Sequence, residues 1–189
     1  MEELKERIRR LGVVVSEQTL KLDEVLNHQV EPRLIMELGK QFALLYRNEQ
    51  VTKVVTIESS GIAVGFATAL ELNVPLVFAR RKKTLATDDE LYWERVPSFT
   101  KGMVTDIIVS KRLLGPEDRV LLIDDIIANG DAARGLIRII RKSGVHLVGL
   151  GIVVEKSFQA GARAIRDEGY RLESLVRIKS LKGGQVEFE

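Results

Sequence analysis

The chain has 189 residues, of which 45% are hydrophobic, and this is enough for one domain with a substantial core over residues 1–189. The 29 Lys and Arg nearly balance the 27 Asp and Glu, and a net charge of +2 argues against a dedicated nucleic-acid binder. The absence of cysteine excludes disulfides and thiol nucleophiles. Because no apolar run reaches the roughly 20 residues of a membrane span and no secretory signal is readable, we expect a cytoplasmic protein without a membrane partner.

Apolar spacing predicts two helices and a short strand before residue 50. Leu4, Ile8 and Leu11 recur at helical spacing within Glu2–Leu11, which indicates an amphipathic helix. The valines of Val13–Val15 favour a short strand. A longer helix is predicted from Pro32 onward, because proline suits the first helical turn and apolar residues then follow at intervals of three and four.

From residue 53 onward, β-branched apolar runs alternate with helical stretches. Strands are predicted at Lys53–Ile57, Val74–Ala79, Arg119–Ile123 and His146–Val154. The intervening helices are predicted at Ile62–Leu72, Ala132–Lys142 and Ala160–Asp167. This alternation is typical of a parallel sheet covered by helices on both faces. Right-handed crossovers then place the loops after the strands along one edge, where ligands of open α/β sheets bind.

The stretch Arg80–Gly102 breaks the pattern. It is polar, mixed in charge and without clear periodicity, and it contains Trp93 and Pro97. A segment of this length inside a compact domain is usually functional or mobile, although the basic run Arg80–Lys83 is, on charge alone, more typical of a solvated loop. A strand is predicted to follow at Val104–Val109.

The strongest chemical signal lies after the predicted strand Arg119–Ile123. Two adjacent carboxylates, Asp124 and Asp125, come at its carboxyl end, and a loop with Gly130 then opens a helix. A loop that leads into a helix N-terminus presents backbone N–H groups to a phosphate, while the carboxylates can accept hydrogen bonds from ribose hydroxyls. The same residues also fit a plain connector in which Asp131 caps the helix and the acids are solvated.

This strand, acid pair and loop resemble the phosphoribosyl pyrophosphate motif of the type I phosphoribosyltransferases. The present copy has Asn129 and Ala132 where many members have threonine, and Asp131 where glycine is common. The resemblance therefore implies that backbone amides and Asn129 replace hydroxyl contacts to the 5′-phosphate.

Further segments are similar to the bacterial members of that family that act on xanthine, in the same order along essentially the whole chain. They are Leu26–Gln29, Val54–Ile62, Val77–Arg80, Ala128–Gly130, Val154–Gln159 and Tyr170–Leu175. The resemblance implies an α/β type I phosphoribosyltransferase fold with a central, mostly parallel sheet flanked by helices. It also implies a small hood, formed mainly by residues 1–30 with the C-terminal segment, and a flexible active-site loop at about residues 80–103.

The resemblance implies an enzyme of purine salvage that transfers the 5-phosphoribosyl group from phosphoribosyl pyrophosphate to xanthine, giving xanthosine 5′-monophosphate and pyrophosphate. Asp124 and Asp125 are then the catalytic pair that orients the ribose. The phosphate-binding residues are Ala128, Asn129, Gly130, Asp131 and Ala132. A Mg²⁺ ion held mainly by substrate oxygens, with no dedicated protein metal site, and a homodimer are also expected.

The resemblance assigns xanthine binding to Leu20, Asn27 and Lys156. Lys156 can only donate hydrogen bonds, which suits a 6-oxo group better than a 6-amino group, and Asn27 can both donate and accept. By itself Lys156 would be read as a surface lysine, and Phe158 as a core residue. Glu58–Gly61 corresponds to a pyrophosphate loop, or else to an ordinary strand-to-helix turn with Ser60 as a cap.

Two other functions remain open. A phosphoribosyl-pyrophosphate-sensing transcription regulator would keep this fold, but the helix Glu2–Leu11 is too little for a helix-turn-helix. The same transfer to guanine, hypoxanthine or adenine would differ only in the base.

Overall fold

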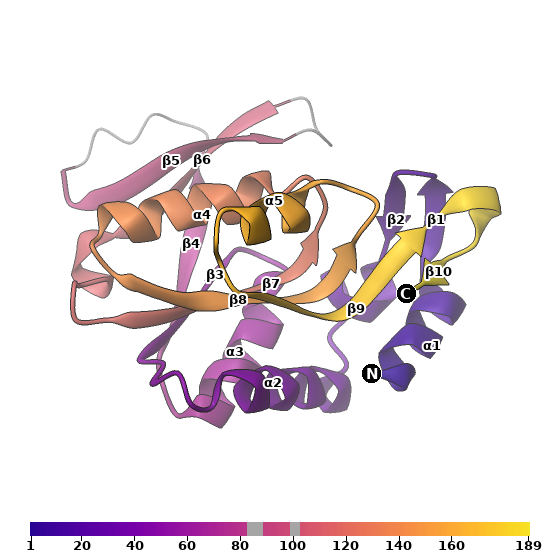
Figure 1. Cartoon of the computed structure of the whole chain (residues 1–189), viewed down its shortest axis with the longest axis horizontal. Coiled ribbons are helices and arrows are strands. Elements are labelled where there is room, and N and C mark those ends of the chain that lie inside the picture. The colour runs from indigo at the N-terminus through magenta and orange to yellow at the C-terminus, as the bar shows by residue number, and fades with distance from the viewer. Residues whose placement is uncertain (83–88, 99–102) are drawn as a thin grey trace.

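The computed structural model describes residues 1–82, 89–98 and 103–189 and is built around one large sheet (Figure 1). Its strands are β3 (Lys53–Ile57), β4 (Leu76–Lys82), β5 (Leu91–Ser98), β6 (Met103–Ser110), β7 (Arg119–Ile127), β8 (His146–Lys156), β9 (Leu172–Ser180) and β10 (Glu187–Phe188). Their order across the sheet is β10-β9-β8-β7-β3-β4-β6-β5. The run from β9 to β4 is parallel, whereas β5, β6 and β10 are antiparallel to their neighbours. The mostly parallel sheet is therefore confirmed.

Helices cover both faces of this sheet, as the alternating pattern predicts. In Figure 1, α2 (Pro32–Tyr46) and α3 (Gly61–Leu72) lie below the sheet, and α4 (Asp131–Lys142) and α5 (Gly161–Asp167) lie above it. Successive side chains of β7 pack on opposite faces of the sheet, since Leu121 belongs to one buried hydrophobic cluster and Leu122 to the other. This explains why the central strands read as unbroken apolar runs.

A small subdomain, the hood, lies at one end of the sheet. It consists of α1 (Glu2–Leu11), β1 (Val13–Ser16), β2 (Thr19–Lys21) and a π-helical turn at Asp23–Asn27. The C-terminal strand β10 packs against it (Figure 1), with the Arg9 guanidinium 4.9 Å from the centre of the Phe188 ring. None of the helices in the described ranges combines the length and apolarity that a membrane crossing requires.

The predicted irregular loop at Arg80–Gly102 is wrong where the structure describes it. Strand β4 continues to Lys82, and β5 pairs with β6 along its whole length, from Leu91 opposite Ser110 to Ser98 opposite Met103. The apolar alternation of a strand is faint here because, among the described side chains of β5, only Val96 is buried. The remainder of that prediction, residues 83–88 and 99–102, lies outside the described residues.

The β5–β6 hairpin packs against α4. Glu94 on β5 accepts a hydrogen bond from Arg138 Nε at 2.7 Å and forms an ion pair with Lys142 Nζ at 2.6 Å. The Lys142 ammonium also lies 5.7 Å from the centre of the Trp93 ring. The packing is close, because a methyl group on Gly135 of α4 would overlap Val96. This contact brings the end of β5 beside the loop that follows β7.

Candidate active site

The acid pair and the loop lie at the carboxyl end of β7, where parallel sheets bind ligands. Gly130 is the residue before α4 and has φ of +81°, a left-handed conformation that favours glycine. The helix begins at Asp131, whose side chain does not cap it, so the alternative in which Asp131 is the cap is wrong. Because the first N–H groups of a helix lack partners within it, this turn offers donors to an anion.

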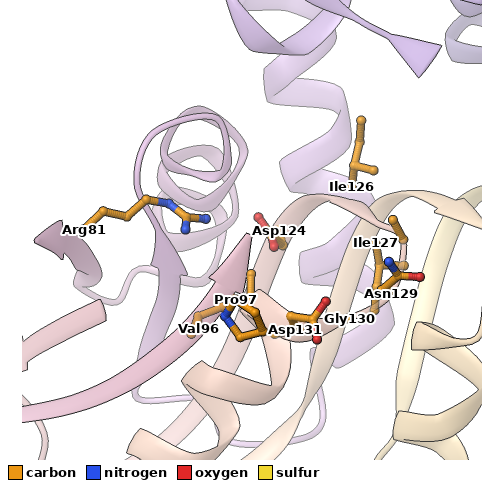
Figure 2. Close-up of a pocket in the computed structure, with 12 residues that line it drawn as sticks. Arg81, Val96, Pro97, Asp124, Ile126, Ile127, Asn129, Gly130 and Asp131 are labelled. Atoms are coloured by element: carbon orange, nitrogen blue, oxygen red, sulfur yellow. The ribbon is translucent and has the colours of Figure 1, made fainter. Parts of the chain in front are cut away.

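A pocket of about 200 Å³ opens at this turn (Figure 2). It brings Asp124 together with all five predicted phosphate-binding residues, whereas Asp125 lies outside its lining. Across from the loop, the Arg81 side chain extends toward Asp124, which places a guanidinium opposite the helix N-terminus. The lining consists of Arg81, Val96, Pro97, Asp124 and residues 126–133.

The turn Glu58–Gly61 borders the same region and is tied to the end of β4. The Arg81 backbone N–H donates to Glu58 Oε1 at 2.7 Å, and Arg80 Nε lies 2.9 Å from Glu58 Oε2. A methyl group on Gly61 would overlap the Thr56 hydroxyl and lie 3.1 Å from Asp124 Oδ1, so only glycine fits beside the acid pair. Ser60 occupies the cap position of α3 without a side-chain capping bond, contrary to the alternative of a capped turn.

The electrostatics of Asp124 favour a ligand that neutralises it. Burial raises the pKa of Asp124 well above its ordinary value, and the neighbouring Asp125 carboxylate acts in the same direction. The Asp125 backbone N–H donates to Asp124 Oδ1 at 3.0 Å, and the charge of Arg81 opposes the upward shift. A hydrogen-bond donor or a cation at this place would relieve the repulsion between the two acids.

Asp125 connects the acid pair to the hood. Asn27, at the end of the π-helical turn, donates from Nδ2 to Asp125 Oδ2 at 2.6 Å. Two residues that are 98 positions apart and were predicted to serve the purine and the ribose are therefore in direct contact.

Lys156, the last residue of β8, also contacts the hood. It is 7% exposed, and its Nζ donates to the backbone oxygen of Gln18 at 2.9 Å. Burial lowers the pKa of Lys156. The Gln159 amide donates to the Gln18 side chain at 2.8 Å, so Gln18 joins the hood to the end of β8. Lys156 is thus not the surface residue that its type alone would suggest.

Leu20 contributes to the core of the hood, with 6% of its surface exposed. Leu20, Asn27 and Lys156 do not line the pocket beside the phosphate loop, and of the three only Asn27 is hydrogen-bonded to the acid pair. Sequence reasoning missed Gln18, which contacts Lys156 through a backbone oxygen and leaves no signal in its residue type. Arg81 was noticed in the sequence only as one residue of the basic run Arg80–Lys83.

The phosphate loop rests on the start of α5. Gly161 donates its backbone N–H to Ala128 oxygen at 3.1 Å. A methyl group on Gly161 would overlap Ala128 oxygen and lie 2.5 Å from both the Asn129 carbonyl carbon and the Gly130 nitrogen. The loop is therefore packed directly against the start of α5.

Comparison with known proteins gives consistent results. Residues 21–182 match the phosphoribosyl transferase domain family. The chain is 54% identical to a xanthine phosphoribosyltransferase of Moorella thermoacetica, with 100% of this chain and 96% of that protein covered. It is 50% identical to a xanthine phosphoribosyltransferase of Pseudomonas aeruginosa, with 100% and 99% covered.

Solved structures resemble the fold. The adenine phosphoribosyltransferase of Giardia lamblia, complexed with 9-deazaadenine, superimposes with a TM-score of 0.77 at 25% identity, covering 92% of this chain and 97% of that one. The adenine phosphoribosyltransferase of Rhodothermus marinus gives 0.73 at 24% identity, with 94% and 100% covered. The fold is therefore that of type I phosphoribosyltransferases.

Proposed function

The chain belongs to the phosphoribosyl transferase family, and we propose that it transfers the 5-phosphoribosyl group from phosphoribosyl pyrophosphate to xanthine, giving xanthosine 5′-monophosphate and pyrophosphate. The observation that carries the proposal is the 54% identity, over the full chain, to a relative that is a xanthine phosphoribosyltransferase. The pocket that joins Asp124 to the loop at Ala128–Ala132 supports it. The assigned role is purine salvage in the cytoplasm.

The reaction breaks the bond between ribose C1 and pyrophosphate and forms a bond from C1 to a purine ring nitrogen. Positive charge develops on the sugar, so alignment of the reactants and fixed charges supply the catalysis. Asp124 and Asp125 accept hydrogen bonds from the ribose and orient it. The loop Ala128–Ala132 holds the 5′-phosphate through backbone N–H groups, and Arg81 faces the leaving pyrophosphate as a guanidinium suited to phosphate.

A Mg²⁺ ion fits this site as a companion of the substrate. No group of three or more acidic or histidine side chains among residues 1–82, 89–98 and 103–189 is arranged to hold a metal, and Mg²⁺ commonly takes one or two carboxylates together with substrate phosphates and water. Asp124 and Asp125 are the carboxylates available to it. Held there, the ion would neutralise negative charge on the pyrophosphate leaving group.

Purine selection is assigned to the contacts between the hood and the end of β8. The Lys156 ammonium donates to the 6-oxo group of xanthine, which adenine lacks. Asn27 serves the dioxo edge of the base and, through its bond to Asp125, sets the purine relative to the ribose. Leu20 supports the hood from its core and offers the base an apolar wall.

The outer face of α3 is proposed as the homodimer interface. This helix carries a single charged residue, Glu71, and exposes Phe66 at 57% and Leu70 at 56%. A helix that is apolar on all sides is normally buried, and a contiguous apolar patch marks an association surface.

The substitution Phe66→Lys tests this interface. It should shift the protein from dimer to monomer in analytical ultracentrifugation, whereas the matched change Leu113→Lys, at another exposed apolar residue, should not. If the unaltered protein sediments as a monomer, the proposed interface is wrong.

The decisive experiment is an assay of the purified protein with phosphoribosyl pyrophosphate, Mg²⁺ and one purine in each reaction: xanthine, guanine, hypoxanthine or adenine. Fastest formation of xanthosine 5′-monophosphate is expected. Faster use of another purine would show that the transfer reaction is right and that only the assigned base is wrong. Binding of phosphoribosyl pyrophosphate without product from any purine would contradict the enzyme and favour the sensor.

A further inference from the structure

A buried carboxylate outside the reacting region has an unusual number of donors. Glu155, the penultimate residue of β8, is 1% exposed and receives two hydrogen bonds from Arg166, from Nη1 at 2.9 Å and from Nη2 at 2.7 Å. The Ser174 hydroxyl donates at 2.5 Å, and Arg177 Nε lies at 3.4 Å. Burial acts to raise the pKa of Glu155, but the bonds from Arg166 and Ser174 lower it below its ordinary value. The group is therefore a paired buried anion, which is tolerated because its partners are in place.

Glu155 lies between the two halves of the proposed site. On one side it is paired with Ile127 of β7, the residue that precedes the phosphate loop. The next residue in the chain is Lys156. Since neighbouring side chains of a strand point to opposite faces, Glu155 is directed to α5 while Lys156 is directed to the hood, where it meets Gln18.

The partner Arg166 extends the connection to the phosphate loop. It lies on α5, five residues after Gly161, and its Nε also donates to Leu172 oxygen at 3.2 Å. At 1.5 Å per residue, Arg166 is about 7.5 Å along the helix from Gly161. Gly161 is bonded to Ala128 and has no space for a side chain against the loop. Displacement of α5 would therefore displace the loop.

We infer that Glu155 and Arg166 are positioning residues that fix the phosphate loop relative to Lys156, and so align the activated ribose with the purine. The inference rests on the proposed function, because it assumes that the phosphate loop binds the activated ribose and that Lys156 binds the purine. Neither residue touches substrate. The physical reason is that a bimolecular transfer depends on the mutual placement of its reactants, and a misplacement of about 1 Å costs on the order of 10²-fold in rate.

The test compares Glu155→Gln with Glu49→Gln. The first change keeps the shape of the side chain but removes the negative charge that pairs with Arg166. The second removes the ion pair of Glu49 with Arg171, at 2.9 Å on a half-exposed surface, and is the matched control. Glu155→Gln should lower kcat/KM for phosphoribosyl pyrophosphate and for the purine, each by about 10- to 100-fold, and Glu49→Gln should change either by less than about twofold.

If Glu155 and Arg166 served only to stabilise the fold, Glu155→Gln would leave kcat/KM unchanged at temperatures where the variant is folded. Kinetics are measured well below the unfolding temperature of each variant, as found by circular dichroism. Unchanged kcat/KM values, or a loss confined to one substrate, would overturn the inference. If Glu155→Gln does not fold, Arg166→Lys takes its place under the same criteria, because lysine keeps the charge but loses the two-point grip.

Failure of the proposed function is recognised separately. The assay of the unaltered chain identifies the purine that it uses, and the variants are then compared with that purine. If no purine reacts, calorimetric binding of phosphoribosyl pyrophosphate decides: weaker binding to Glu155→Gln than to Glu49→Gln supports the link to the phosphate loop, and equal binding overturns it.

Discussion

The two ends of the site are built in different ways. At the phosphate end, one short segment supplies most of the pocket, because Asp124, the loop and the first turn of α4 follow one another along the chain, and Arg81, Val96 and Pro97 complete the lining. At the purine end, the contacts join distant residues, with Asn27 bonded to Asp125 and Lys156 bonded to Gln18. The first end depends mainly on local backbone geometry and the second on tertiary packing. Changes at the first should alter binding of phosphoribosyl pyrophosphate, and changes at the second should alter choice of base.

Loss of the acid charge at Asp125 is the most severe test, because this residue belongs to both ends. Asp125→Asn should lower kcat by on the order of 10²- to 10³-fold, as expected when a preorganised charge at a reacting centre is removed. Steady-state kinetics at saturating substrates measure this. The control is Asp167→Asn at an exposed carboxylate of α5, and unchanged kcat in Asp125→Asn would exclude that residue from the site.

Gly161→Ala tests the phosphate end alone. The added methyl group overlaps Ala128 oxygen, so the loop must shift, and KM for phosphoribosyl pyrophosphate should rise by up to about 10²-fold with a smaller effect on KM for xanthine. Gly115→Ala is the control, because a methyl group there has nothing nearer than 3.9 Å. An equal rise in KM for the two substrates would contradict the separation of the ends.

Lys156→Met tests the purine end alone. Removing a hydrogen bond from a charged donor costs about 1.5 kcal/mol or more, which corresponds to roughly a tenfold rise in KM for xanthine. Binding of phosphoribosyl pyrophosphate, followed by calorimetry, should change less. Lys179→Met at an exposed lysine of β9 controls for the general loss of a cation, and the assignment fails if the two variants use xanthine equally well.

The smallest expected effect concerns stability. Because the pKa of Asp124 is raised in the folded protein, the fold prefers the protonated form, and ionisation lowers the free energy of unfolding as the pH rises above the ordinary value of 3.8. Asp124→Asn should therefore raise the Tm at neutral pH, by about 2–4 °C for each 1 kcal/mol relieved. The gain should disappear below pH 3.8, as thermal unfolding at the two pH values can establish. A lower Tm at neutral pH would contradict the cost assigned to this carboxylate.

The difference between the ends also decided what the sequence could predict. The strand, the acid pair and the loop before α4 are contiguous, so periodicity and residue type located them, and the helices and parallel strands from residue 53 followed from the same patterns. The link between Lys156 and Gln18 uses a backbone oxygen, and the link between Asn27 and Asp125 spans 98 positions. Neither residue type nor spacing contains that information.

Strands β5 and β9 were the least predictable elements of the sheet. Strand β5 includes Pro97 and buries only Val96 among its described side chains, and β9 alternates buried Val176 and Ile178 with charged Arg177 and Lys179. Their stability comes from pairing with a neighbour and from ion pairs such as that of Glu94 with Arg138, so their sequences resemble those of loops.

The packing of β5 on α4 has a spectroscopic consequence. Trp93 is the sole tryptophan of the chain, it is 37% exposed, and its ring lies beside the Lys142 ammonium on α4. The tryptophan fluorescence of the protein therefore originates from one indole at the junction of hairpin and helix. Any step of turnover that separates the two elements changes the polarity around that single fluorophore, so the protein carries its own optical reporter of hairpin position.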